Sequence, residues 1–397
     1  MPKPPRLFRR CADLDYSDCQ RSLGIMYEYG RGVPLSKETA FSWYEAAAER
    51  GNADAYVDVG YDYQTGTGVA PNPVEAVRWY RLAADADNLR GIASLAEMLR
   101  FGSGTDRDYK EALRLHEKAA ARDHWPSVVD LGRMYTTGQG VEADPKKGFE
   151  YYRRAAEAGN DDGMYLVGID FRDGTGTEKD LLKAMAWLNK AADAGNGSAM
   201  NDLGYAFESG EGVGQDYAQA LLWYRKAAAL GEATAMTNIG AFYDSGRGVE
   251  KDAQEAYRWY KKAADQDDGR AQDLIGTLYL NGSLGEKDED RAFSWFAKGA
   301  ENDDSDAIAD LGVMYEEGAG TAKDEAQAVK LYRRAADLGN ARAMRFLGMN
   351  YAEGIGVARD RAESRRWYEK AVAAGDDEAA ELLQKLKDSP SAASAIA

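Results

Sequence analysis

Histidine and cysteine are the side chains that most readily bind transition metals or act as nucleophiles, and this chain of 397 residues contains only two of each. His116 stands where other copies of a repeated pattern carry an aromatic residue, and His124 stands in a turn. No cysteine or carboxylate pattern around either histidine matches a zinc site. No nucleophile is paired with a base. We therefore expect no metal site, no cofactor and no catalytic residue, and hence a protein that is not an enzyme.

The two cysteines, Cys11 and Cys19, have two explanations. They lie 36 residues before Ala47 and Ala55, so the simplest reading is that each is a small, buried apolar residue. Their spacing also allows a disulfide between the end of one helix and the start of the next, if the compartment is oxidising. Both explanations remain open.

Glycine-rich turns such as Gly66-Thr67-Gly68 superficially resemble phosphate-binding loops. They follow expected helices rather than strands, and no Gly-Lys-Ser or Gly-Lys-Thr ending appears. A single aspartate in many loops, such as Asp108, lacks a partner at coordinating spacing, so it is better explained as a helix N-cap than as a calcium ligand. Both features are therefore interpreted as structural.

Helices must position these residues, and a sequence pattern that recurs every 36 residues predicts where those helices lie. Nine of the ten copies contain a glycine at one position, which we call the pivot, and the third copy has alanine there; an aliphatic residue precedes this position, and Tyr, Phe or Leu follows it three residues later. Such self-similarity is typical of repeat solenoids. The pivot positions are Gly24, Gly60, Ala96, Gly132, Gly168, Gly204, Gly240, Gly276, Gly312 and Gly348.

Each copy predicts two helices. In the second copy, residues 53–65 carry apolar side chains at helical spacing, and Gly66 is expected to end this helix in the left-handed conformation. Asn72 and Pro73 then suit the start of a second helix, which carries Trp79 on its apolar face. The predicted fold is an all-α solenoid of helix–turn–helix pairs.

One copy shows the motif in both helices and both turns, through Gly240, Tyr243, Gly246, Gly248, Asp252, Trp259, Tyr260, Ala263 and Ala264. This pattern resembles the Sel1-like repeat, a relative of the tetratricopeptide repeat, and the resemblance covers residues 17–376. It implies a right-handed superhelix whose first helices line a concave face. It also implies non-enzymatic scaffold or adaptor roles in signalling, protein quality control, and bacterial envelope or host contact.

The third copy departs from the family pattern, with Ala96 at the pivot and Leu99, Leu115 and His116 at positions that are usually aromatic. The departure predicts a looser or kinked layer. Cysteine pairs with the eight-residue spacing of this chain recur in secreted relatives, but this chain has a single pair.

We expect a half-repeat or capping helix at 1–16, marked by Leu7 and Phe8, a capping helix at 377–388 and a disordered tail at 389–397. Between them, the ten repeats are expected at 17–52, 53–88, 89–124, 125–160, 161–196, 197–232, 233–268, 269–304, 305–340 and 341–376.

The net charge of −17 argues against nucleic acid as a partner, because phosphate binding needs a basic surface. No apolar run is long enough for membrane insertion. The first ten residues are charged but lack the apolar core of a secretory signal. We therefore expect a cytoplasmic monomer, with a trimmed periplasmic or secreted form as the alternative.

By analogy with tetratricopeptide units, exposed first-helix positions are expected to bind a partner protein or peptide in the concave groove, since Tyr and Arg dominate binding hot spots. A structural spacer or self-assembling array is the alternative. The expected binding residues are Asp58, Tyr61, Glu97, Arg100, Asp130, Arg133, Tyr165, Arg172, Asn201, Tyr205, Asn238 and Asp244.

A basic residue follows the Trp-Tyr position in most repeats, for example Lys118, Arg154, Lys226, Lys262 and Lys298. The simpler interpretation is a solvated face that favours the negative end of its helix. The alternative is a docking surface for an acidic partner.

Overall fold

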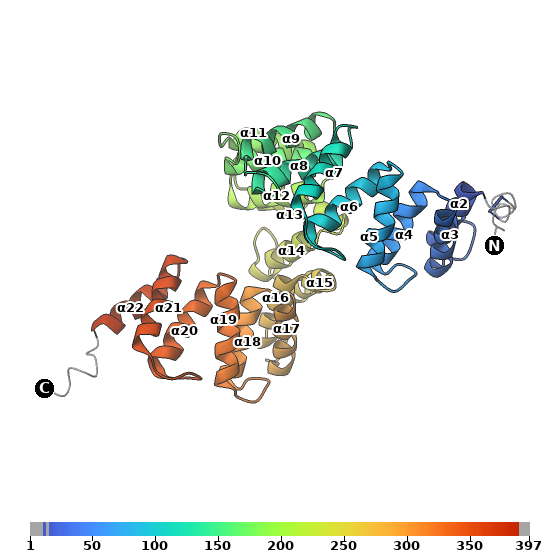
Figure 1. Cartoon of the computed structure of the whole chain (residues 1–397). Coiled ribbons are helices and arrows are strands. Elements are labelled where there is room, and N and C mark those ends of the chain that lie inside the picture. Colours follow the sequence, from blue (N-terminus) through green and yellow to red (C-terminus); the bar gives the residue numbers. More distant parts are fainter. Residues whose placement is uncertain (1–10, 13–15, 389–397) are drawn as a thin grey trace. The chain divides into compact units, whose positions relative to one another are not determined.

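The computed structural model describes residues 11–12 and 16–388, and throughout this part of the chain the regular elements are helices (Figure 1). The expected half-repeat around Leu7 and Phe8 and the expected tail at 389–397 lie outside the described residues. The helices are α2 (Ser17–Glu28), α3 (Lys37–Glu49), α4 (Ala53–Thr65), α5 (Pro73–Asp85), α6 (Leu89–Phe101), α7 (Tyr109–Ala120), α8 (Trp125–Thr137), α9 (Pro145–Glu157), α10 (Asp161–Asp173), α11 (Leu181–Asp193), α12 (Gly197–Ser209), α13 (Tyr217–Ala229), α14 (Ala233–Ser245), α15 (Ala253–Ala264), α16 (Gly269–Leu280), α17 (Glu289–Glu301), α18 (Ser305–Glu317), α19 (Glu325–Asp337), α20 (Ala341–Glu353), α21 (Arg361–Ala373) and α22 (Asp377–Asp388).

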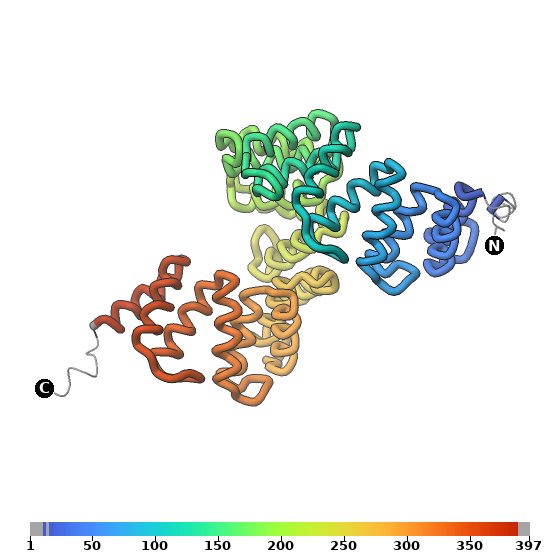
Figure 2. The backbone as a smooth tube through the Cα atoms, in the orientation of Figure 1, coloured from blue at the N-terminus to red at the C-terminus, as the bar shows by residue number. Residues whose placement is uncertain are grey.

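The chain forms two compact units, Met1–Asn196 and Gly197–Ala397. Within each unit, an even-numbered helix and the odd-numbered helix after it form a hairpin, and successive hairpins lie beside one another (Figure 2). We call the even-numbered helices α2 to α20 first helices and their odd-numbered partners second helices. The observed architecture confirms the predicted all-α solenoid.

The pivot glycine makes room for a buried aromatic ring of the second helix. A Cβ atom at Gly60 would lie 2.6 Å from Cε1 of Tyr80, and one at Gly132 would lie 2.3 Å from Cε1 of Tyr152. Both rings are buried, so they have little space to move away. The glycine and the ring therefore form one packing unit in most hairpins; in the fifth, Gly168 faces Leu188 instead of a ring.

The third repeat solves the same packing problem with different residues. Ala96 and His116 replace the glycine and the tyrosine and are fully buried, and Leu99 and Leu115 are largely buried beside them. Helices α6 and α7 are continuous over their whole length. The expected kink is therefore not present within either helix, while the expectation of a looser layer stays a prediction. The imidazole is smaller than the ring of tyrosine, which is compatible with an alanine at the pivot.

The turn glycines take the expected conformation. Gly66 ends α4 with φ 77°, in the left-handed region. A Cβ at the second turn glycine, Gly68, would lie 2.2 Å from the carbonyl oxygen of Lys37 in the preceding repeat. The second glycine thus permits close backbone contact between successive repeats. Asn72 caps α5 by accepting a hydrogen bond from the amide of Glu75.

Cys11 and Cys19 form a disulfide, with 5.7 Å between their Cα atoms. This resolves the alternatives that the sequence left open, in favour of the bridge.

Candidate functional site

The first helices of the N-terminal unit are joined through Asp58, a residue of α4. Its carboxylate accepts a hydrogen bond from Nε of Arg21 on α2, and Nη1 of Arg90 on α6 lies 3.8 Å from it. Burial raises the pKa of Asp58, although Arg21 and Arg90 oppose this shift. The arginines were not among the expected binding residues; Arg21 lies on the first helix of the repeat before Asp58, and Arg90 on that of the repeat after it.

Four of the expected binding residues come together where α6 meets α8. Nη1 of Arg100 lies 3.3 Å from Oε1 of Glu97 and 3.7 Å from Oδ1 of Asp130. Nη1 of Arg133 donates to Oδ1 of Asp130 at 2.9 Å. Asp130 was expected to be exposed but is only 9% accessible, because both arginines and the neighbouring helices enclose it. Burial and the charge of Glu97 raise its pKa against the effect of the positive groups.

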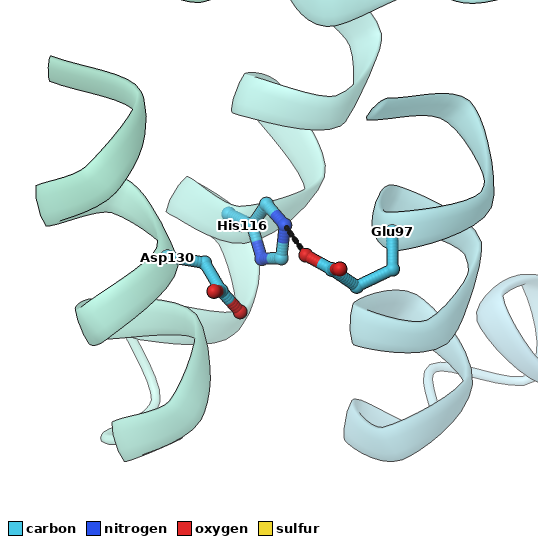
Figure 3. A group of neighbouring side chains, drawn as sticks. All are labelled: Glu97, His116 and Asp130. Carbon is cyan, nitrogen blue, oxygen red and sulfur yellow. Dashed lines mark ion pairs between the residues drawn. The ribbon is translucent and has the colours of Figure 1, made fainter. Parts of the chain in front are cut away.

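His116 of α7 completes this group, which we call the α6–α8 cluster (Figure 3). Its Nε2 lies 3.5 Å from Oε1 of Glu97. Burial acts to raise the pKa of Glu97, but His116 and Arg100 outweigh it and the net shift is downward. The structure thus places two carboxylates near His116, although no sequence pattern around this histidine matches a zinc site. The group has no recognisable sequence pattern because its members lie on three different helices.

In the C-terminal unit, two expected residues form a polar connection across three first helices. Nδ2 of Asn238 on α14 donates to Oδ1 of Asn201 on α12 at 3.1 Å. Oδ1 of Asn238 in turn accepts from Nη1 of Arg270 on α16 at 3.2 Å. These amides therefore already use part of their hydrogen-bonding capacity within the protein.

The remaining expected residues are Tyr61, Tyr165, Arg172, Tyr205 and Asp244. Tyr61 and Tyr205 are about half exposed, at 52% and 54%. Tyr165 and Asp244 are partly buried. Nε of Arg172 pairs with the neighbouring Asp173 at 2.8 Å, which lowers the pKa of that carboxyl.

The basic residues of the second helices have partners within the protein. The Nζ atoms of Lys226 and Lys262 each lie 3.7 Å from the ring centre of the tryptophan three residues earlier, in cation–π geometry. Lys118 pairs with Asp87, and Arg154 with Asp123. These contacts support the interpretation of a solvated face rather than a docking surface.

Exposed aromatic side chains are concentrated at the first helices. Among the described residues, the large aromatics classed as exposed all lie on a first helix or at its end: Tyr16, Tyr29, Tyr61, Phe101 and Tyr205. Such side chains provide large contact areas at protein interfaces. Tyr61 and Tyr205 were among the expected binding residues. Tyr29 and Phe101, which lie at helix ends, were not.

None of the helices in the described part of the chain is long and apolar enough to span a membrane. No curated protein sequence gives a significant match.

Among solved structures, a protective antigen of uropathogenic Escherichia coli with an SLR fold, c5321, is 33% identical, with a TM-score of 0.58; the match covers 97% of this chain and 83% of that one. A Sel1 repeat protein from Oxalobacter formigenes is 31% identical, with a TM-score of 0.51 over 54% of this chain and 85% of its own.

The family model for the Sel1 repeat matches ten segments, at 17–52, 53–88, 90–124, 126–160, 161–196, 197–232, 233–268, 269–304, 305–340 and 341–376. Proteins built from these repeats generally mediate protein–protein interaction, and the match indicates no catalytic family. With most of its length matched in this way, the chain belongs to the Sel1 repeat family.

Proposed function

We propose that this chain is a non-enzymatic scaffold that binds a partner protein or peptide through the first helices of its N-terminal unit. The observation that carries the proposal is the exposure of Tyr29, Tyr61 and Phe101, at 58%, 52% and 57%, on three successive first helices or their ends. We call these three residues the aromatic patch. Exposed aromatic groups lose unfavourable contact with water when a partner covers them.

The charged residues beside the patch have a different role. Glu97, Arg100, Asp130 and Arg133 already neutralise one another, so a partner would have to replace these contacts before gaining from new ones. Affinity should therefore depend mainly on the aromatic patch, while the charged residues limit which partners fit. This ranking refines the expected set of binding residues.

The test begins with a partner identified by cross-linking to the intact chain, whose affinity is then measured with purified components. Replacing the three residues of the aromatic patch with serine should weaken binding by about 30-fold or more, since truncating even one hot spot costs about 2 kcal/mol. The matched control replaces Leu82, Leu182 and Leu222, which are exposed on second helices. Equal loss in both variants would contradict the proposal.

A structural spacer or self-assembling array remains the second candidate. It predicts association of the purified chain, which mass measurement in solution detects. A monomer whose partner affinity depends on the aromatic patch would exclude self-assembly as the main role.

The Cys11–Cys19 disulfide favours a periplasmic or secreted location over the cytoplasm, because disulfides persist in oxidising compartments. The relative described as a protective antigen is compatible with that location. Trapping free thiols in cells before lysis tests it: a cytoplasmic protein would react at both cysteines, and an exported one at neither.

A further inference from the structure

The hydrogen bonds around His116 define which of its ring nitrogens carries a proton. The backbone N–H of Ser127 donates to Nδ1 of His124 at 3.4 Å, so this nitrogen is an acceptor. The hydroxyl of Ser127, 3.0 Å from the same nitrogen, must then donate to it. Its oxygen lies 3.2 Å from Nδ1 of His116, which can only be the donor of that bond.

With Nδ1 protonated, neutral His116 presents the lone pair of Nε2 to the α6–α8 cluster. His116 is fully buried, and Nε2 makes no hydrogen bond. Nε2 faces Oε1 of Glu97 at 3.5 Å, and this contact is favourable when a positive centre lies between the two atoms, either a proton on Nε2 or a metal ion. Figure 3 shows Glu97 and Asp130 on either side of the ring.

We propose that Glu97, His116 and Asp130 bind a divalent transition-metal ion of the Zn²⁺ type. One donor atom from each residue lies within 4.8 Å of the other two. Two ligands of one zinc ion are about 3.4 Å apart, given bond lengths of about 2.1 Å, so the 3.5 Å separation of His116 and Glu97 fits, while Asp130 must move closer to complete the site. The donor set of one imidazole and two carboxylates suits this ion.

Two further features suit such a site. The bond from Nδ1 of His116 to Ser127 orients the ring, as second hydrogen bonds of metal-binding histidines do. The side chain of Glu97 is 36% exposed, which gives an ion access from solvent. The site does not depend on the proposed scaffold function, and three protein ligands leave a position open for water.

Arg100 is the competing cation. Its Nη1 contacts the same two carboxylates, so a metal ion must displace it, and Arg133 also holds Asp130. Substituting Arg100→Gln should therefore tighten metal binding by about tenfold, because it removes a positive charge that contacts both carboxylates. The same change would also favour a proton in the cluster, so the two explanations are separated by direct measurement of bound metal.

The experiment titrates the chelator-treated full chain with Zn²⁺ by calorimetry and with Co²⁺ by visible absorption. We expect one ion per chain, and a loss of affinity of more than about tenfold in Glu97→Gln. The control for the fold is the double variant Ala96→Gly with His116→Tyr, which restores the glycine–tyrosine pair of repeats such as the second. It should fold but lose the ion.

His124 provides the matched control for histidine binding. His124→Asn keeps the N-cap, since Asn52 and Asn88 cap the equivalent helices, and it should retain the ion. Equal binding by the wild type and the double variant would reveal an adventitious ion only and overturn the proposal. Failure of both the wild type and Arg100→Gln to bind either Zn²⁺ or Co²⁺ would also overturn the proposal.

Discussion

The second and third repeats of the N-terminal unit perform the same packing with different residues. In the second, Gly60 accommodates the ring of Tyr80, whose hydroxyl donates to Gln64 at 2.7 Å. In the third, Ala96 and His116 occupy the corresponding positions, and the imidazole turns toward two carboxylates. The comparison teaches that the family pattern constrains the combined size of the pair, so that one substitution in the pair permits another.

The largest expected effect comes from placing the alanine of the third repeat in the second. Gly60→Ala puts a methyl group 2.6 Å from Tyr80, which should destabilise the N-terminal unit by about 3 kcal/mol. Urea unfolding with amide hydrogen exchange in α4 and α5 measures the loss. The reverse change, Ala96→Gly, should cost no more than about 1 kcal/mol, from helix propensity. Similar losses in both would show that the pair is not size-coupled.

The second prediction places the tyrosine in the third repeat. His116→Tyr alone should cost about 2 kcal/mol because the larger ring meets the methyl group of Ala96. Adding Ala96→Gly should recover most of this loss, which a double-mutant cycle of unfolding free energies would measure. Additive effects of the two changes would contradict the packing argument.

The third prediction concerns the residue two positions after the pivot, which is Asp62 in the second repeat and Met98 in the third. Burial, followed by the charges of Glu28 and Asp58, raises the pKa of Asp62 to about 7. A raised carboxyl pKa gives stability that is complete below the unfolded value of about 4 and is lost as pH rises to about 7.

Asp62→Met should therefore stabilise the unit by about 2 kcal/mol at pH 8, allowing for partial solvation, and should flatten the pH dependence between about 4 and 7. Thermal unfolding across this pH range tests both effects. Asp62→Asn is the control of similar shape, and a pH profile unchanged in both variants would refute the assignment to Asp62.

The smallest effect is expected from the tyrosine hydroxyl, which the third repeat lacks. Tyr80→Phe removes the hydrogen bond to Gln64 and should cost about 1 kcal/mol in unfolding free energy. Tyr260→Phe is the matched control, since the hydroxyl of Tyr260 is buried without a hydrogen bond and its removal should cost nothing. A larger loss of unfolding free energy in Tyr260→Phe than in Tyr80→Phe would contradict the role given to the hydrogen bond between Tyr80 and Gln64.

Much of the fold could be predicted because its rules are local. Gly66 and Asn72 mark helix ends through their own conformations and caps, and both behave as expected. The candidate site was predicted less well. Tyr61 is exposed as anticipated, but Asp130 is buried and the contribution of His116 was missed. Exposure and charge pairing depend on neighbouring helices, which a pattern within one repeat does not describe.

The sequence by itself determined the repeat length, the helix pairs and the family, because each repeat contacts chiefly its neighbours and the same residues recur in the same positions. Only the tertiary structure decided that Glu97, His116 and Asp130 meet, and that Cys11 is bonded to Cys19. The physical reason is that such meetings depend on how side chains from different helices pack, and periodicity carries no information about that.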